Sequence, residues 1–136
     1  MKVAALDTGD VWTGIALSDA LKMLAKPYKT ISSGELYTYI PTLLAAEKID
    51  TIVIGYPKTM RGTESEQTKK IVALKEQLAT RFPQVKWILW DERLSSKRAD
   101  ALKRAKTKEE KIQSHSVAAA FILQSYLGYL HIQENS

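Results

Sequence analysis

The sequence has no cysteine, no internal repeat, no low-complexity segment and no apolar run long enough to cross a membrane. Without cysteine neither a disulfide framework nor a thiolate zinc site can form, so the folded state must rest on a hydrophobic core. A bilayer-spanning helix needs about 20 apolar residues, and the first residues lack the apolar region and cleavage site of a signal peptide. These absences, with a length of 136 residues, predict one domain over residues 1–136 in the cytoplasm, with no membrane partner.

Positive charge exceeds negative charge: the formal net charge is +5 and the isoelectric point is near 9.4. Such a balance favours polyanionic partners such as nucleic acid. The excess is concentrated in the stretch 97–111, which carries Lys97, Arg98, Lys103, Arg104, Lys106, Lys108 and Lys111 against Asp100, Glu109 and Glu110. This stretch is either a face that contacts phosphates or a solvated helix surface with intrahelical ion pairs, and the sequence favours neither.

The first half of the chain predicts a hairpin, a third strand and a helix. Two runs of β-formers, 2–6 and 11–17, are separated by turn residues at 8–10 and indicate a β-hairpin. A third strand is expected at 28–31, and apolar residues at helical spacing predict a helix over 35–48, strained or kinked by the proline at position 41.

The second half alternates strands and helices. We predict buried strands at 51–56 and 85–90, a helix from a capping box of Thr63 and Glu66 to Phe82, a basic helix to about 106, and a terminal helix opened by Thr107 and Glu110. The expected fold class is α/β, with a mixed five-stranded sheet whose opening strands are antiparallel, whose later strands are parallel and whose faces are flanked by helices.

Two carboxylates and one histidine are candidates for chemistry. Asp7 ends the first strand, Glu92 follows the last one, and His115 lies on the apolar stripe of the terminal helix. Ligand sites lie beyond strand ends, and carboxylate oxygens suit hard divalent cations that activate water in phosphodiester cleavage. A histidine there could ligate a metal or transfer a proton. Each residue also has a purely structural interpretation: an Asx turn, a surface acid and a hydrogen-bonded core histidine.

Four blocks along the chain resemble the signature of a known family. They are Leu6–Gly9 continuing through Gly14–Asp19, Ile54–Pro57 with Met60–Thr63, Asp91–Ser95, and Ala118–Leu127. In this order they resemble the YqgF/RuvX family over nearly the whole chain. The resemblance implies a ribonuclease H-like fold related to Holliday-junction resolvases, and a nuclease that matures the 5′ end of pre-16S ribosomal RNA in ribosome biogenesis. It also implies that Asp7, Glu92 and the start of the last helix, at His115, form a site for Mg²⁺ or Mn²⁺.

The chain departs from the family pattern at two places. The family usually has an aspartate where this chain has His115, which should weaken Mg²⁺ binding or favour Mn²⁺. The family also commonly has a basic residue near Val11 or Trp12. Trp12 either stacks on a base in its place or packs as an ordinary strand tryptophan.

Several basic residues are predicted to contact nucleic acid. Lys58 and Arg61 lie in a glycine-containing connection, and Arg93 pairs either with phosphate or with a carboxylate. The full predicted set is Lys58, Arg61, Arg93, Lys97, Arg98, Lys103, Arg104 and Lys106. The partners expected are an rRNA precursor or branched DNA, with ribosomal particles as a further partner, and the chain acts as a monomer or homodimer.

The sequence also leaves alternatives to a metal-dependent nuclease. One alternative is a non-catalytic RNA- or ribosome-binding factor of the same fold, and another is a Holliday-junction resolvase acting on DNA. The triplet Asp7–Gly9 also matches aspartic proteases and the opening hairpin of actin-like ATPases. The first are β-dominated and the second need another similar half, so both are discounted.

Overall fold

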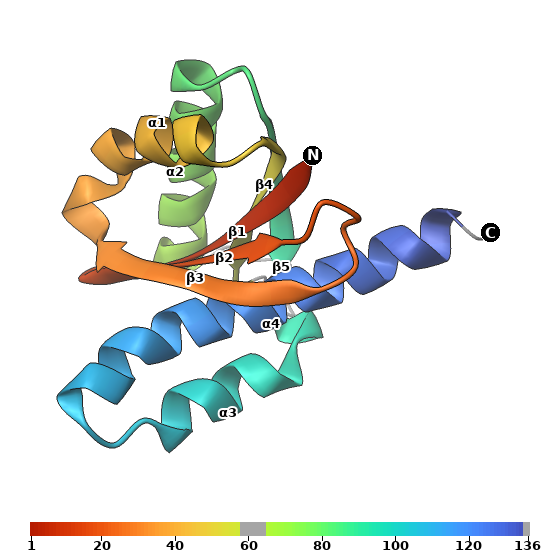
Figure 1. Cartoon of the computed structure of the whole chain (residues 1–136). Coiled ribbons are helices and arrows are strands. Elements are labelled where there is room, and N and C mark those ends of the chain that lie inside the picture. The colour runs from red at the N-terminus through yellow and green to blue at the C-terminus, as the bar shows by residue number, and fades with distance from the viewer. Residues whose placement is uncertain (58–64, 135–136) are drawn as a thin grey trace.

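The computed structural model describes residues 1–57 and 65–134 and contains a five-stranded sheet in the order β3-β2-β1-β4-β5 (Figure 1). Its strands are β1 (Lys2–Thr8), β2 (Trp12–Ser18), β3 (Ala25–Ser32), β4 (Ile49–Tyr56) and β5 (Lys86–Asp91). The pairs β1–β2 and β2–β3 are antiparallel, whereas β1–β4 and β4–β5 are parallel. The predicted α/β fold class, with its antiparallel opening and parallel later strands, is confirmed.

Helices cover both faces of the sheet, as Figure 1 shows. The helices are α1 (Leu36–Ala46), α2 (Glu66–Arg81), α3 (Ser96–Arg104) and α4 (Lys108–Glu134), with single 3₁₀ turns at Ser33–Glu35 and Glu92–Leu94. The first two lie on one face and α4 crosses the other, while α3 packs on the outer side of α4. Within the described ranges, no helix combines the length and apolar character that a membrane span requires.

Side-chain alternation along β1 divides the core into two clusters. Ala4 and Leu6 pack in the cluster beneath α1 and α2, and Val3 and Ala5 pack in the cluster beneath α4. Because successive side chains of a strand point to opposite faces, Asp7 continues the series that faces α4. An apolar core position is therefore replaced by a carboxylate at the end of this strand.

Helix boundaries mostly follow the sequence signals. The capping box of Thr107 and Glu110 is confirmed: the Glu110 N–H donates to Thr107 Oγ1 at 3.1 Å, and the Thr107 N–H donates to a Glu110 carboxylate oxygen at 3.3 Å. Thr63 lies outside the described residues, and the residue that caps α2 is Ser65, whose hydroxyl accepts from the Thr68 N–H. Helix α1 is continuous through Pro41, and the third strand is longer than expected.

Candidate active site

The two candidate carboxylates lie at the same edge of the sheet. Asp7 is near the end of β1 and pairs with Gly14 of β2, and Glu92 begins the 3₁₀ turn directly after β5. Since β1, β4 and β5 run parallel, their carboxyl ends share one edge, where ligand sites of open α/β sheets lie. The chain thus brings together two acids that are far apart in sequence.

Arg98 of α3 connects these carboxylates. Its Nε donates to Asp7 Oδ2 at 3.0 Å and its Nη2 donates to Asp7 Oδ1 at 3.1 Å, a two-pronged pair. The same Nη2 lies 3.4 Å from Glu92 Oε2. The exposed fractions of the three side chains are 5% for Asp7, 16% for Glu92 and 23% for Arg98. The guanidinium therefore lies between both acids in a largely desolvated cluster.

The cluster has more negative than positive charge. Burial raises the pKa of Glu92, the charges of Asp7 and Asp91 raise it further, and the Arg98 guanidinium opposes that rise. Burial by itself lowers the pKa of Arg98, but the charge and hydrogen bonds of Asp7, together with the charge of Glu92, raise the pKa overall. Arg98 therefore stays protonated, and one guanidinium faces two carboxylates.

His115 lies close to this edge in α4, but it does not complete a three-ligand set. Gly14, the ladder partner of Asp7, packs against the backbone of His115 and Ser116. His115 is half-buried, and among residues 1–57 and 65–134 no three His, Asp or Glu side chains are grouped so that they could hold a metal ion. Asp7, Glu92 and His115 are thus not grouped in such a set among the described residues, and Arg98 lies between the two acids.

Arg93 adopts one of its two predicted roles. Its Nε and Nη2 donate to the Asp91 carboxylate at 2.8–3.1 Å, so it pairs with a carboxylate. Trp12 is half-buried at the start of β2 and Val11 is exposed. The predicted phosphate contacts Lys58 and Arg61 lie outside the described residues.

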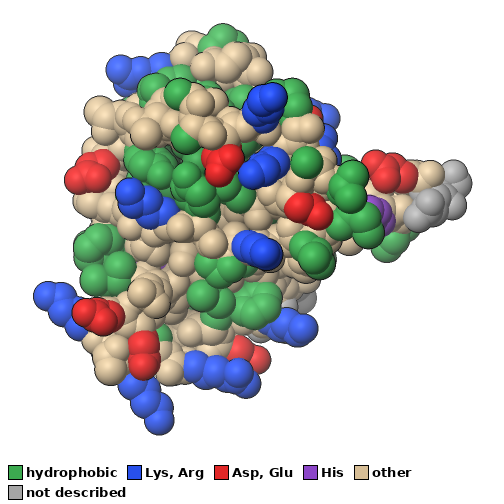
Figure 2. Space-filling view, viewed as in Figure 1, with side chains coloured by type: hydrophobic (Ala, Val, Ile, Leu, Met, Phe, Trp, Pro, Cys, Tyr) green, Lys and Arg blue, Asp and Glu red, His purple; other side chains and the backbone are tan. Residues whose placement is uncertain are grey.

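The predicted basic face carries both signs of charge. Lys97, Lys103 and Arg104 are exposed on α3, and Lys106 is exposed after it. Figure 2 shows basic and acidic side chains interspersed over the lower end of the molecule, where α3 and the start of α4 lie. Arg98 differs from its neighbours because it turns inward to the acids. The charge run is therefore a mixed surface with one inward-facing arginine, a distinction that spacing alone did not reveal.

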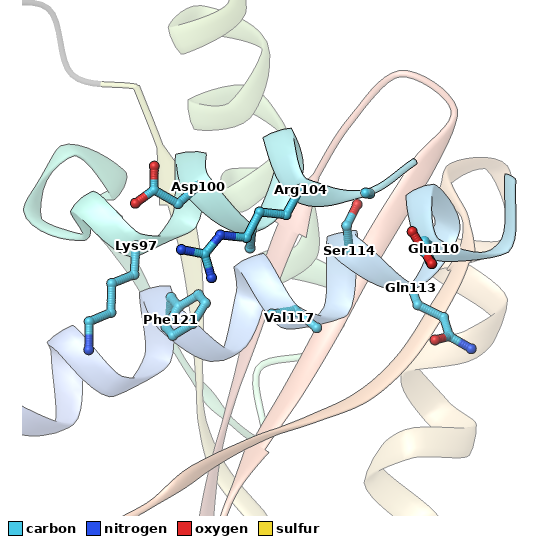
Figure 3. A pocket seen from close by; sticks show the side chains of 10 residues that line it. Lys97, Asp100, Arg104, Glu110, Gln113, Ser114, Val117 and Phe121 are labelled. Atoms are coloured by element: carbon cyan, nitrogen blue, oxygen red, sulfur yellow. The ribbon is translucent and has the colours of Figure 1, made fainter. Parts of the chain in front are cut away.

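A pocket that the sequence did not reveal lies between α3 and α4. It is open to solvent, has a volume of about 660 Å³, and has Val117 and Phe121 on its α4 side. Lys97, Asp100 and Arg104 form its α3 side, and in Figure 3 the Arg104 side chain reaches across toward Phe121. The two helices are thus separated by open space along part of their length.

The fold and the paired acids define a class of protein, and comparison with known proteins identifies the family. The chain is similar to a solved structure of Thermus thermophilus RuvC, described as in complex with Holliday junction substrate. The matched region covers 97% of this chain and 96% of the RuvC chain, with a TM-score of 0.65 and 16% sequence identity. At that identity the likeness shows the fold, which is ribonuclease H-like. The class is therefore a ribonuclease H-like α/β domain.

Sequence similarity is consistent with this class. The family model described as "RuvX: Holliday junction resolvase" matches residues 1–129, and the chain belongs to this family of nucleases, which are hydrolases. A relative from Rubrobacter xylanophilus is 35% identical over 127 residues, covering 93% of this chain and 91% of the relative. One from Agathobacter rectalis is 36% identical over 142 residues, covering 96% of each. Both carry the name "Putative pre-16S rRNA nuclease".

Proposed function

We propose that the chain is a divalent-metal-dependent endonuclease that cleaves structured nucleic acid at the edge formed by Asp7 and Glu92. The observation that carries this proposal is the meeting of two largely buried carboxylates at the carboxyl edge of the sheet, both paired with Arg98. Burying two acids side by side is costly unless a cation compensates them. A site of this kind is a natural binding position for a positively charged group.

The donor chemistry of the two acids fits Mg²⁺ or Mn²⁺. Magnesium in proteins is commonly bound through one or two carboxylates, with waters and substrate phosphates as its other ligands. Asp7 and Glu92 would hold the ion, and when bound it would supply Lewis-acid charge and a more acidic water. A third protein ligand is not required by this chemistry, so the position of His115 outside a ligand group is compatible with the proposal.

We assign proton transfer to His115. Imidazole is the side chain that gains and loses a proton near neutral pH, and it is a common general acid or base. The His115 backbone packs on Gly14, which pairs with Asp7, so the residue belongs to the same end of the sheet. Phosphate contact is assigned to the exposed cations on and after α3, which are Lys97, Lys103, Arg104 and Lys106.

The substrate we infer is the 5′ region of pre-16S ribosomal RNA, in free RNA or in ribosomal particles. The names of the relatives support this substrate. A four-way DNA junction is the alternative substrate, supported by the description of the family model. The second candidate function is a non-catalytic RNA-binding factor, and the specific observation that favours it is the Arg98 guanidinium lying where a catalytic cation would bind.

The test is cleavage of a pre-16S transcript and of a DNA junction by the purified chain with Mg²⁺ or Mn²⁺. We expect cleavage that disappears in Asp7→Asn and in Glu92→Gln. Asp50→Asn is the matched control, because Asp50 is a part-buried aspartate with its own lysine partner at the other end of the sheet. Asp7→Asn as active as the parent would refute the assigned site. Tight RNA binding without cleavage under both metals would support the binding factor instead.

A further inference from the structure

Helix α3 is attached to the sheet edge through Arg98. None of the α3 residues whose side chains the structure describes is fully buried, and Ser95 at its start makes no side-chain capping bond. Its packing partner is α4, and the pocket of about 660 Å³ opens between the two helices. The ion pairs from Arg98 to Asp7 and Glu92 are therefore a principal tie between this helix and the edge of the sheet.

The guanidinium and a metal ion would need the same oxygen atoms. Arg98 uses both carboxylate oxygens of Asp7, and its shared Nη2 also faces Glu92 Oε2. A divalent ion bound by these two acids would meet a protonated guanidinium at contact distance in a desolvated cluster, where repulsion between like charges is strong. The two cations therefore compete for the same carboxylate oxygens.

We propose that Arg98 is a built-in counter-cation that a divalent metal must displace before Asp7 and Glu92 can bind it, so that metal loading releases α3 from the sheet edge. This inference rests on the proposed function for identifying the acids as the metal site. Once displaced, Arg98 remains on a helix that exposes Lys97, Lys103 and Arg104, where its charge is available to a phosphate. Metal binding and nucleic-acid binding are thereby coupled through one side chain.

The direct test titrates Mn²⁺ alone into the parent chain and into Arg98→Gln, with calorimetry or the electron paramagnetic resonance signal of free Mn²⁺ as the readout. We expect the variant to bind Mn²⁺ about tenfold more tightly or better, because two buried acids are then left without a partner. Lys97→Gln is the matched control, since it removes the same charge from the same helix but at an exposed side chain. Its affinity should stay close to that of the parent.

Thermal unfolding gives a second readout, which separates metal binding from a loss of stability in the variant. In a chelator, Arg98→Gln should melt below the parent, and Mn²⁺ should raise its melting temperature more than it raises that of the parent. Arg98→Lys keeps the charge without the two-pronged geometry, and we expect it to fold and to bind Mn²⁺ with intermediate affinity. Hydrogen exchange of α3 amides in the parent should become faster when Mn²⁺ is added.

Two results would overturn the proposal: equal Mn²⁺ affinity in Arg98→Gln and Lys97→Gln, or absence of Mn²⁺ binding in every Arg98 variant. These outcomes are separable from failure of the proposed function. Tight Mn²⁺ binding by Arg98→Gln without cleavage of any substrate rejects the nuclease assignment and leaves the counter-cation intact. Cleavage that depends on Asp7, with Mn²⁺ affinity unaffected by Arg98, rejects the counter-cation and leaves the nuclease assignment intact.

Discussion

Replacing Gly14 by alanine should separate α4 from the sheet. An ideal Cβ on Gly14 would lie 1.9 Å from the His115 carbonyl oxygen, 2.1 Å from its carbon and 2.6 Å from the Ser116 nitrogen. These are backbone atoms of a long helix, so no side-chain rotation can relieve the overlap. The helix must move by more than an ångström along this stretch, and the packing beneath it must follow.

The magnitude follows from comparison with ordinary overpacking, which costs about 1–3 kcal/mol when side chains can adjust. Because the Gly14 overlap is with backbone, we expect a loss of about 3 kcal/mol or more in the free energy of unfolding. Gly55 provides the matched control: its Cβ would lie 2.6 Å from Ile122 Cδ1, the end of a flexible side chain. Gly55→Ala should cost about 1 kcal/mol, within the lower part of the same range.

Urea denaturation followed by far-ultraviolet circular dichroism measures both variants. With slopes of about 1–3 kcal/mol/M typical for small domains, Gly14→Ala should lower the midpoint by roughly 1 M or more. The same variant should impair any activity that depends on His115, since the backbone it displaces belongs to that residue. A midpoint for Gly14→Ala equal to or above that of Gly55→Ala would refute the reasoning.

Three further predictions concern the helix cap, an acid-dependent turn and the basic face. Thr107→Ala should lower the free energy of unfolding by about 1 kcal/mol in urea melts, because a capping hydroxyl at the start of α4 is lost. Asp19 accepts backbone N–H bonds that lower its pKa, so the stability it contributes is present above its unfolded pKa and lost as pH falls through its folded pKa. Asp19→Asn should therefore lower the melting temperature near pH 7 but not in strong acid, as scanning calorimetry at several pH values would show. Replacing Lys103, Arg104 and Lys106 by glutamate should reduce the salt dependence of RNA affinity, because fewer phosphates are then neutralised. An unchanged dependence of affinity on salt would show that these three side chains do not contact RNA.

Much of the fold could be predicted because its signals are local. The continuous apolar run of β4 predicted a strand buried on both faces, and Ile52 and Val53 lie in opposite clusters of the core. The Thr107 capping box correctly predicted the start of α4. The cap of α2 was misplaced among neighbouring hydroxyl residues, because Ser65 can accept the same kind of backbone bond as Thr63.

The acids of the site could be located from the sequence, whereas their partner could not. Asp7 lies at the end of one strand and Glu92 directly follows another, and the rule that parallel strands end at one edge brings them together. Arg98 belongs to a run of basic residues, and helical spacing does not say which of them turns inward. That choice depends on how α3 packs on α4, which is a long-range property. An arginine on the first turns of a helix that follows a candidate acid is the signal that could have raised the question.

Arg98 and His115 change the charge of the site in the same direction. Against the family pattern that the resemblance implies, histidine removes a negative charge from the end of the sheet, and Arg98 supplies a positive one between the remaining acids. Both features reduce the need of Asp7 and Glu92 for an external cation. The two candidate functions therefore differ in which interaction with Asp7 and Glu92 is stronger, that of Arg98 or that of a divalent ion. If a divalent ion with substrate phosphate outweighs the Arg98 pairs, the chain is a nuclease whose metal loading is gated by α3. If the Arg98 ion pairs are the stronger, the chain is a stable nucleic-acid-binding domain without cleavage. The Mn²⁺ affinities of the parent and of Arg98→Gln measure which of the two interactions is stronger.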